Sequence, residues 1–226
     1  MSSGKSEKMQ IPTNWTFRSP EVAADFDRHV REQLPWYDLA TGAVAHFVRH
    51  YLPEGGLLID VGASTGNIGR AVADILKARS AELIAIDNSE EMVAAYDGPG
   101  RAVVGDVREF DFADYRPDVI VSFLVLMFLP APDRRAVIER MKESVRPGGA
   151  VIVFDKMEPG QGYLSSVVYR LTLAGKYEAG AAPDEIIKKE LSLAGVQRPM
   201  TEGELTDFRA IFRFGDFAGF VYERPI

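Results

Sequence analysis

Apolar residues follow two patterns along this chain. Runs of four or five apolar residues alternate with longer segments in which apolar residues recur every three or four positions. The short runs are typical of buried strands, and the longer repeat is typical of amphipathic helices. From residue 57 onward the two patterns alternate, which predicts a parallel sheet with helices on both faces.

Seven strands are predicted in total. Five apolar runs predict parallel strands at 57–61, 83–86, 102–104, 119–123 and 150–154. Helices are expected at 19–34, 37–51, 66–77, from about 88 onward, and at 132–145. The aromatic-rich runs 208–214 and 217–222 flank a Gly-Asp turn and predict an antiparallel hairpin. The expected fold is therefore α/β and doubly wound, with a mostly parallel seven-stranded sheet that ends in this hairpin.

The segment from about 159 to 205 breaks the alternation. It predicts two or three glycine-interrupted helices with no strand between them. Because it lies between the fifth strand and the hairpin, we expect it to form a helical cap over the ligand-binding edge of the sheet. Residues 1–13 are predicted to be disordered, and residues 14–226 to form a single domain with the cap as an insertion.

Composition narrows the functional classes. The chain has no cysteine and only three histidines, which argues against disulfides and against a metal site. A net charge of −7 favours a small-molecule substrate over nucleic acid, whose binders usually carry a basic face. No apolar run reaches the roughly 18 residues expected of a membrane span, and the start lacks a signal-peptide core. We therefore expect a cytoplasmic protein without membrane contact.

The most informative segment is the turn after the first predicted strand. The strand ends in Asp60, and small residues including Gly62 and Gly66 then lead into a helix. About twenty residues later the second strand ends in Asp87. Small residues allow the backbone to approach a ligand closely, and an acid at that spacing accepts hydrogen bonds from ribose hydroxyls. The pair predicts a bound nucleoside cofactor.

The glycine spacing differs from the Gly-x-Gly-x-x-Gly of dinucleotide enzymes, so a nicotinamide oxidoreductase is disfavoured. With Asp60 before Gly62 and the terminal hairpin, the chain instead resembles the class I S-adenosylmethionine-dependent methyltransferases over nearly its whole length. The matching segments occur in the order of that family, at 59–66, 84–87, 105–107, 118–122 and 146–149.

The chain also resembles the carboxy-S-adenosylmethionine synthases of tRNA wobble-uridine modification. The residues that carry this resemblance are Asn14-Trp15-Thr16-Phe17, Phe26-Asp27-x-x-Val30, Pro35-x-Tyr37, 84–89, 127–129 and 212–215. In that family a carboxylate from prephenate is moved onto the sulfonium methyl group. The resemblance also suggests a homodimer in which the cap helices reach the neighbouring site.

The resemblance implies that the cofactor is S-adenosylmethionine, possibly in its carboxylated form. Asp60 would pair with the methionine ammonium group, Asp87 with the ribose and Asp106 with the adenine amino group, although each could also serve as a simple cap or turn residue. The expected cofactor-binding set is Tyr37, Asp60, Gly62, Ala63, Ser64, Gly66, Asp87, Asn88, Asp106, Val107 and Ser122.

Candidates for substrate binding are Phe123, at the end of the fourth strand, and Tyr169 in the cap. The resembling synthases hold the donor carboxylate with a cap arginine, and the nearest matches here are Lys188 and Lys189. A lysine is a point charge and lacks the two-pronged contact of arginine.

Three hypotheses remain open from the sequence. The chain is a methyltransferase with an unknown acceptor, a carboxy-S-adenosylmethionine synthase or a user of that product, or a non-catalytic module that binds an adenosyl ligand. No catalytic residue is assigned, because the sulfonium carbon is already electrophilic and the protein must chiefly align the two reactants.

Overall fold

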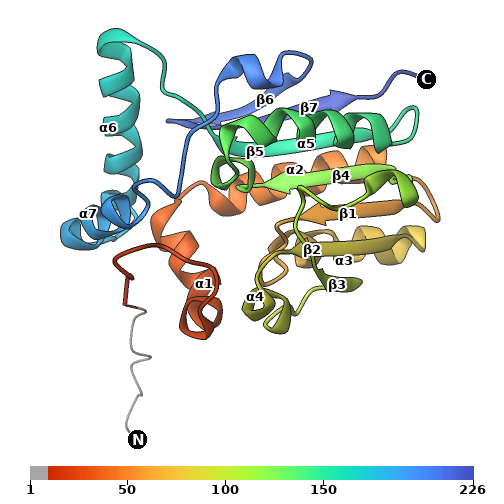
Figure 1. Cartoon of the computed structure of the whole chain (residues 1–226), viewed down its shortest axis with the longest axis horizontal. Coiled ribbons are helices and arrows are strands. Elements are labelled where there is room, and N and C mark those ends of the chain that lie inside the picture. The colour runs from red at the N-terminus through yellow and green to blue at the C-terminus, as the bar shows by residue number, and fades with distance from the viewer. Residues whose placement is uncertain (1–9) are drawn as a thin grey trace, which may run out of the picture.

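The computed structural model describes residues 10–226, and the expectation of disorder for residues 1–9 lies outside this part. Its sheet has the strand order β3-β2-β1-β4-β5-β7-β6 (Figure 1). The parallel strands are β1 (Leu57–Val61), β2 (Glu82–Asp87), β3 (Arg101–Val104), β4 (Val119–Phe123) and β5 (Ala150–Lys156). The antiparallel strands are β6 (Arg209–Phe214) and β7 (Phe217–Glu223). The predicted fold class is confirmed.

The helices before β5 lie close to their predicted positions. They are α1 (Pro20–Gln33), α2 (Tyr37–Tyr51), α3 (Asn67–Arg79), α4 (Glu90–Ala94) and α5 (Ala131–Ser144), with short 3-10 turns η1 (Phe112–Asp114) and η2 (Leu126–Phe128). Ser19 caps α1 because its hydroxyl accepts a hydrogen bond from Val22 N–H. The α3 helix begins one residue later than expected, since Gly66 has a left-handed φ of 99°.

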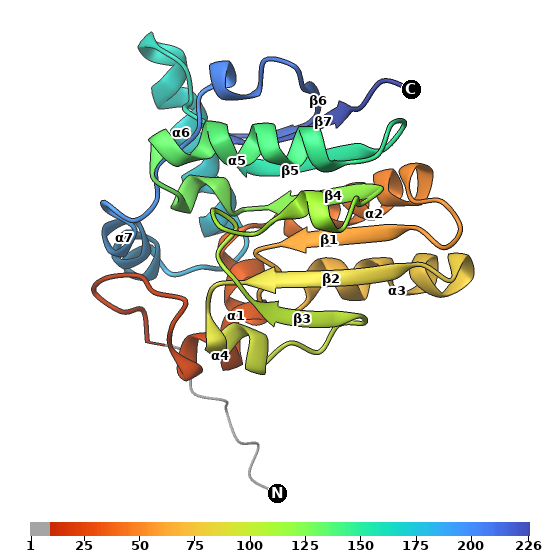
Figure 2. The ribbon, with the colours of Figure 1, turned by 45° about the vertical axis from the view of Figure 1, so that its right-hand side comes forward.

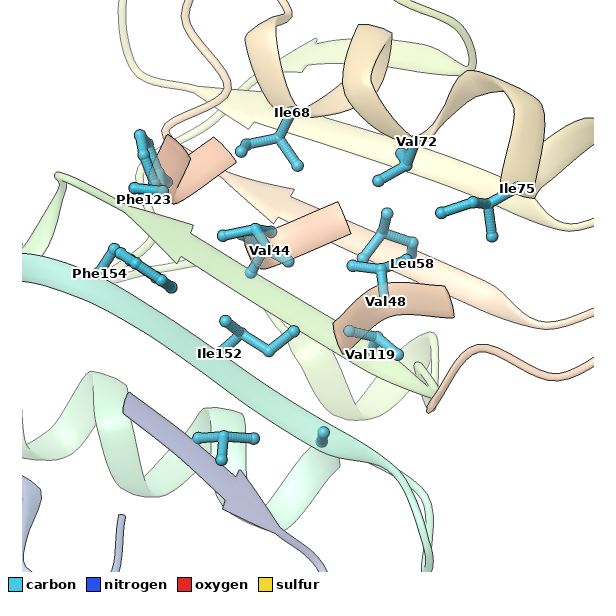
Figure 3. Packing of buried hydrophobic residues seen from close by; sticks show 14 of the residues in the cluster. Val44, Val48, Leu58, Ile68, Val72, Ile75, Val119, Phe123, Ile152 and Phe154 are labelled. Carbon is cyan, nitrogen blue, oxygen red and sulfur yellow. The ribbon is translucent and has the colours of Figure 1, made fainter. Parts of the chain in front are cut away.

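Two apolar layers enclose the sheet. Side chains of α2 and α3, including Val44 and Val72, pack on one face against Leu58, Val119 and Ile152 (Figure 3). The other face packs against α5 in a separate cluster. Successive residues of a strand point to opposite faces, so each residue at a strand end is assigned to one layer or the other. This assignment decides which of them face the site.

The strand order reverses beside β1, which lies between β2 and β4. Ligands of doubly wound sheets bind outside the carboxyl ends of the strands at such a reversal. Figure 2 shows the arrowheads of β1, β2 and β3 pointing to the side on which α1 and α7 lie.

The predicted cap contains α6 (Gly162–Glu178), α7 (Pro183–Ser192) and η3 (Glu202–Leu205). The part of the cap that holds α6 and α7 leaves and returns beside the end of β5, because Met157 and Met200 form a β-bridge. Met200 N–H donates to Lys156 O at 2.8 Å, and Glu158 N–H donates to Met200 O at 2.7 Å. The strand β5 is two residues longer than predicted and carries Asp155 and Lys156 to this junction.

Within residues 10–226, no helix is long and apolar enough to cross a membrane. The same part of the chain holds no cluster of three or more His, Cys, Asp or Glu residues suited to a metal ion.

Candidate active site

A cavity lies at the carboxyl edge of the sheet, between the strand ends, α1 and the cap. Residues 14–18, here called the N-terminal strap, close one side of it. Trp15 N–H donates to Ser192 O in α7 at 2.9 Å, and the Ser89 hydroxyl donates to Phe17 O at 2.8 Å. The Phe17 ring packs edge-on against Phe128. The strap therefore connects α7 to the start of α4 across the cavity.

The loop between β1 and α3 lines the cavity with backbone. Gly62 has a φ of 65°, and a Cβ atom there would collide with the side chain of Val125. Ser64 has a φ of 50°, which is unusual for a residue with a side chain. Its N–H donates to an Asp87 carboxylate oxygen at 2.8 Å. The loop thus takes a shape that brings its backbone next to the acid at the end of β2.

Asp60 is the least satisfied group of the site. Its side chain is 1% exposed, and neither carboxylate oxygen has a hydrogen-bond partner in the described chain. Burial, and secondarily the negative charge of Asp87, raises the pKa of Asp60 well above its ordinary value. Burial also raises the pKa of Asp87, against the opposing effect of N–H donors from Ser89 and Ser64. A buried, unpaired carboxyl group at this place suits a cationic ligand.

The part of the cavity that was predicted to face adenine is formed after β3. Val107 is 6% exposed and lines the cavity together with Asp106 and Asn88. Arg108 binds the Asp106 carboxylate at 2.6 Å, and this hydrogen bond holds the pKa of Asp106 below its ordinary value. Asp106 therefore stays ionised and able to accept a further hydrogen bond at neutral pH.

The opposite end of the cavity is lined by lysines. Lys156 at the end of β5, Lys176 on α6 and Lys189 on α7 are 8%, 5% and 8% exposed. Lys176 pairs with Glu190 at 2.6 Å, and Lys156 donates to the Gln197 side chain at 3.0 Å. Acids therefore stand at the ends of β1, β2 and β3, and lysines stand beyond β4, where Lys176 pairs with Glu190 and Lys156 with Asp216.

Lys189 differs from the other two lysines. Its ammonium group lies against the face of the Trp15 ring, and no hydrogen bond or ion pair to it is found in residues 10–226. Burial, and then the neighbouring charge of Lys176, lowers the pKa of Lys189 to about 5. A buried amine without an anionic partner is expected to bind an anion brought by a ligand.

The loop after β4 forms part of the floor. Leu124 has a φ of 63°, and its N–H donates to Phe154 O at 2.7 Å. The carboxylate of Asp155 accepts hydrogen bonds from the N–H groups of Leu126 and Met127. Left-handed backbone at a residue other than glycine costs about 1 to 3 kcal/mol and persists only where surrounding contacts impose it. Here those contacts hold the loop against the cavity.

Most predicted site residues come together in this cavity. Those that line it are Tyr37, Asp60, Gly62, Ala63, Ser64, Asp87, Asn88, Asp106, Val107, Phe123 and Lys189.

Four predicted residues lie outside the lining. Ser122 is fully buried and, one position before Phe123, points to the α5 face of the sheet, away from the layer that contains Phe123. Gly66 packs closely on Gly98 and the Tyr96 ring, so its lack of a side chain serves loop packing. Tyr169 is 39% exposed, and the exposed Lys188 pairs with Asp184 instead.

Sequence reasoning did not single out several residues that line the lysine end and the α1 wall: His29, Gln33, Lys156, Glu190 and Gln197. One signal was present for two of them. His29 and Gln33 are polar residues on the side of α1 that also carries Phe26 and Val30, which is otherwise apolar.

Comparisons with known proteins agree with this geometry. A family described as "Methyltransferase domain" matches residues 58–149. A putative S-adenosyl-L-methionine-dependent methyltransferase from Methanococcus maripaludis shares the fold with a TM-score of 0.58 at 15% identity, over 99% of this chain and 98% of that one. The plantazolicin methyltransferase BpumL, solved with SAH, has a TM-score of 0.61 at 11% identity, over 90% and 89% of the two chains.

The fold, the cavity and these matches define an S-adenosylmethionine-dependent transferase of the methyltransferase class. The carboxy-S-adenosyl-L-methionine synthase of Staphylococcus epidermidis is 30% identical over 93% of this chain and 97% of its own length. The synthase of Wolinella succinogenes is 28% identical over 90% and 91% of the two chains. The chain belongs to the carboxy-S-adenosyl-L-methionine synthase family.

Proposed function

We propose that this enzyme carboxylates the sulfonium methyl group of S-adenosylmethionine and takes the carboxyl group from prephenate. The observation that carries the proposal is that acids line one end of the cavity and lysines line the other. S-adenosylmethionine brings a sulfonium and an ammonium cation, which suit Asp60 and its acidic neighbours. A carboxylate donor suits the end at which Lys189 has no anionic partner among the described residues.

The acidic end is proposed to hold the adenosyl ligand. The unpartnered Asp60 carboxyl group would pair with the methionine ammonium, and Asp87 would accept from the ribose hydroxyls. The loop can pack against Val125 beside the cavity only because Gly62 has no Cβ. Val107 would pack on the adenine ring while Asp106 accepts from its amino group.

The lysine end is proposed to hold the donor. A bond forms between the methyl carbon and the donor carboxyl carbon, while the donor ring loses that carboxyl group and its hydroxyl, which leaves with one methyl proton as water. Lys189 would bind and orient a donor carboxylate, and the strap and cap would exclude water during transfer. Lys156, which pairs with Asp216 at 3.6 Å, lines this end from the β5 side.

Methyl transfer to an anionic small molecule is the second candidate, because the same lysines would equally bind an acidic acceptor. The two candidates differ in their product. Carboxylation adds one carboxyl group to the adenosyl ligand, whereas methylation leaves S-adenosylhomocysteine. A binding module without turnover would give neither product.

The direct test is mass spectrometry of the nucleosides after incubation with S-adenosylmethionine and prephenate. We expect the carboxylated nucleoside from the wild-type enzyme and a loss of at least tenfold in rate from Lys189→Met. Lys188→Met is the matched control, because Lys188 is adjacent in sequence but exposed and paired with Asp184. S-adenosylhomocysteine as the product, or equal effects of the two substitutions, would contradict the proposal.

We also propose that the enzyme acts as a homodimer through its cap. Exposed apolar residues gather on α6 and α7, and such a patch favours a protein interface. They are Tyr163, Leu164, Val167, Tyr169, Leu171, Tyr177, Ile187 and Leu191. Light scattering should give twice the chain mass for the wild type and one chain mass for Leu191→Glu. A cytoplasmic location stays part of the proposal and is tested by cell fractionation.

A further inference from the structure

Two polar side chains on the cavity side of α1 each hold a buried atom that has no hydrogen-bond partner in residues 10–226. His29 and Gln33 stand one helical turn apart and are 7% and 5% exposed. His29 Nε2 and Gln33 Oε1 both lack a hydrogen-bond partner among the described residues, and both side chains line the cavity. Burial of such atoms costs free energy that a ligand can recover by pairing with them.

These side chains share a wall with the free amine of Lys189. The imidazole of His29 stacks on the Trp15 ring with a centroid distance of 5.5 Å and an interplanar angle of 22°. The Lys189 ammonium lies against the same ring. Trp15 thus joins the polar face of α1 to the cap lysine, and the wall belongs to the donor end of the cavity.

The chemistry of this wall differs from that of the lysines. Burial, and then the charge of Lys189, lowers the pKa of His29 to about 3, so its ring is neutral at neutral pH. A neutral imidazole has one N–H donor and one acceptor nitrogen, and an amide oxygen only accepts. A carboxylate has no proton to give to Gln33 Oε1, whereas a hydroxyl group both donates and accepts. The wall therefore matches an uncharged hydroxyl.

We propose that His29 and Gln33 bind a hydroxyl group of the second substrate whose carboxylate lies at Lys189. The inference rests on the proposed function and adds the part of the second substrate that the α1 wall selects. His29 and Gln33 are then specificity residues for a hydroxylated carboxylic acid, and a matching acid without the hydroxyl binds less tightly.

The test is calorimetric binding to protein saturated with S-adenosylhomocysteine, so that no turnover is needed. The two probes are 4-hydroxyphenylpyruvate and phenylpyruvate, which differ by one hydroxyl group. We expect the wild type to prefer the hydroxylated probe by roughly fivefold to hundredfold, the value of two hydrogen bonds. His29→Phe and Gln33→Leu should each lower this preference by the value of one hydrogen bond, and the double variant should bind the two probes equally. Glu32→Gln is the control, because Glu32 pairs with Arg28 on the same helix and does not line the cavity.

Thermal unfolding of the ligand-free variants gives a readout that a structural role would not produce. His29→Phe keeps an aromatic ring on Trp15, and Gln33→Leu keeps a similar volume. Each removes a buried atom that lacks a partner, so both variants should unfold at a higher temperature than the wild type. Lower unfolding temperatures would mean that the residues serve packing, and would overturn the proposal.

The binding outcomes are also decisive. An unchanged preference in both variants, or no binding of either probe to the wild type, overturns the assignment of the α1 wall. If the preference behaves as expected but no carboxylated nucleoside forms with prephenate, the proposed function fails and the hydroxyl site stands.

Discussion

The buried carboxylate of Asp155 accepts a hydrogen bond of 2.7 Å from the backbone N–H of Leu126, and so ties the end of β5 to the loop after β4. Burial raises the pKa of Asp155 to about 7 although backbone N–H groups oppose this rise. The strength of this link therefore depends on pH.

Asp155→Asn should flatten the pH dependence of stability. The pKa of an aspartate carboxyl group is about 3.9 in an unfolded chain. Between that pH and the folded pKa of about 7, the folded protein therefore binds more protons than the unfolded chain. The contribution of Asp155 is complete below pH 3.9 and is lost as pH rises through about 7. Urea unfolding at pH 5 and pH 8 should show a loss on the order of 2 to 4 kcal/mol that is absent from the variant. The same change in unfolding free energy between pH 5 and pH 8 in both proteins would show that Asp155 is not the group responsible.

Substitution of Gly62 should damage the cofactor loop. Gly62→Ala places a Cβ atom against Val125 at a φ of 65°, and we expect a loss of about 1 to 3 kcal/mol in unfolding free energy with weaker binding of S-adenosylhomocysteine. Val125→Ala in the same chain should recover part of it. Gly42→Ala is the control, since nothing lies within 4 Å of that position on α2, and it should stabilise the helix by about 1 kcal/mol.

Asp60→Asn should weaken only ligands that carry the methionine ammonium group. Loss of a charge-assisted hydrogen bond lowers affinity by roughly tenfold to hundredfold. We expect that loss for S-adenosylhomocysteine and no change for methylthioadenosine, which lacks the amino acid. Equal losses for the two ligands would show that Asp60 shapes the loop and does not bind the ammonium.

Binding of a carboxylate should charge Lys189. Because burial lowers its pKa to about 5, the free enzyme holds a neutral amine at pH 7.5. A bound anion favours the charged form of Lys189, so the protein should take up about one proton per site when phenylpyruvate binds. Binding heats in phosphate and Tris buffers would measure this uptake, and Lys189→Met should abolish it. Identical heats in the two buffers for the wild type would exclude it.

The same lysine sets a second pH effect. Its pKa is depressed in the folded protein, so its contribution to stability is present above the ordinary lysine pKa of about 10.4 and is lost as pH falls toward about 5. This trend is opposite to that of Asp155. The unfolding free energy of Lys189→Met should lack this dependence on pH, whereas that of Lys188→Met should depend on pH as in the wild type.

The sequence predicted the sheet and the acidic half of the cavity because both depend on local patterns. A strand followed by a glycine turn places Asp60 and Asp87 at one edge through backbone geometry alone. The lysine half depends on how α1 and the cap pack over that edge. Lys156 and Lys176 reach the cavity from segments about twenty residues apart, and no short motif encodes this convergence.

The strand period explains the position of Ser122. Alternation places it on the α5 side of the sheet, whereas Phe123 lines the cavity from the opposite side. The fully buried Ser122 hydroxyl has no partner among the described residues. The alternation of faces along β4 would have separated Ser122 from Phe123. A family resemblance matches residue positions and does not say to which face of the sheet a side chain points.

The bridge between Met157 and Met200 has an evolutionary consequence. Met157 and Met200 lie side by side, so the 42 residues between them leave the sheet and return at almost the same point. A closed excursion of this kind can lengthen, shorten or change its sequence without moving β5 or β7. The cap can therefore diverge faster than the strands, and new substrate preferences can arise on an unchanged adenosyl site.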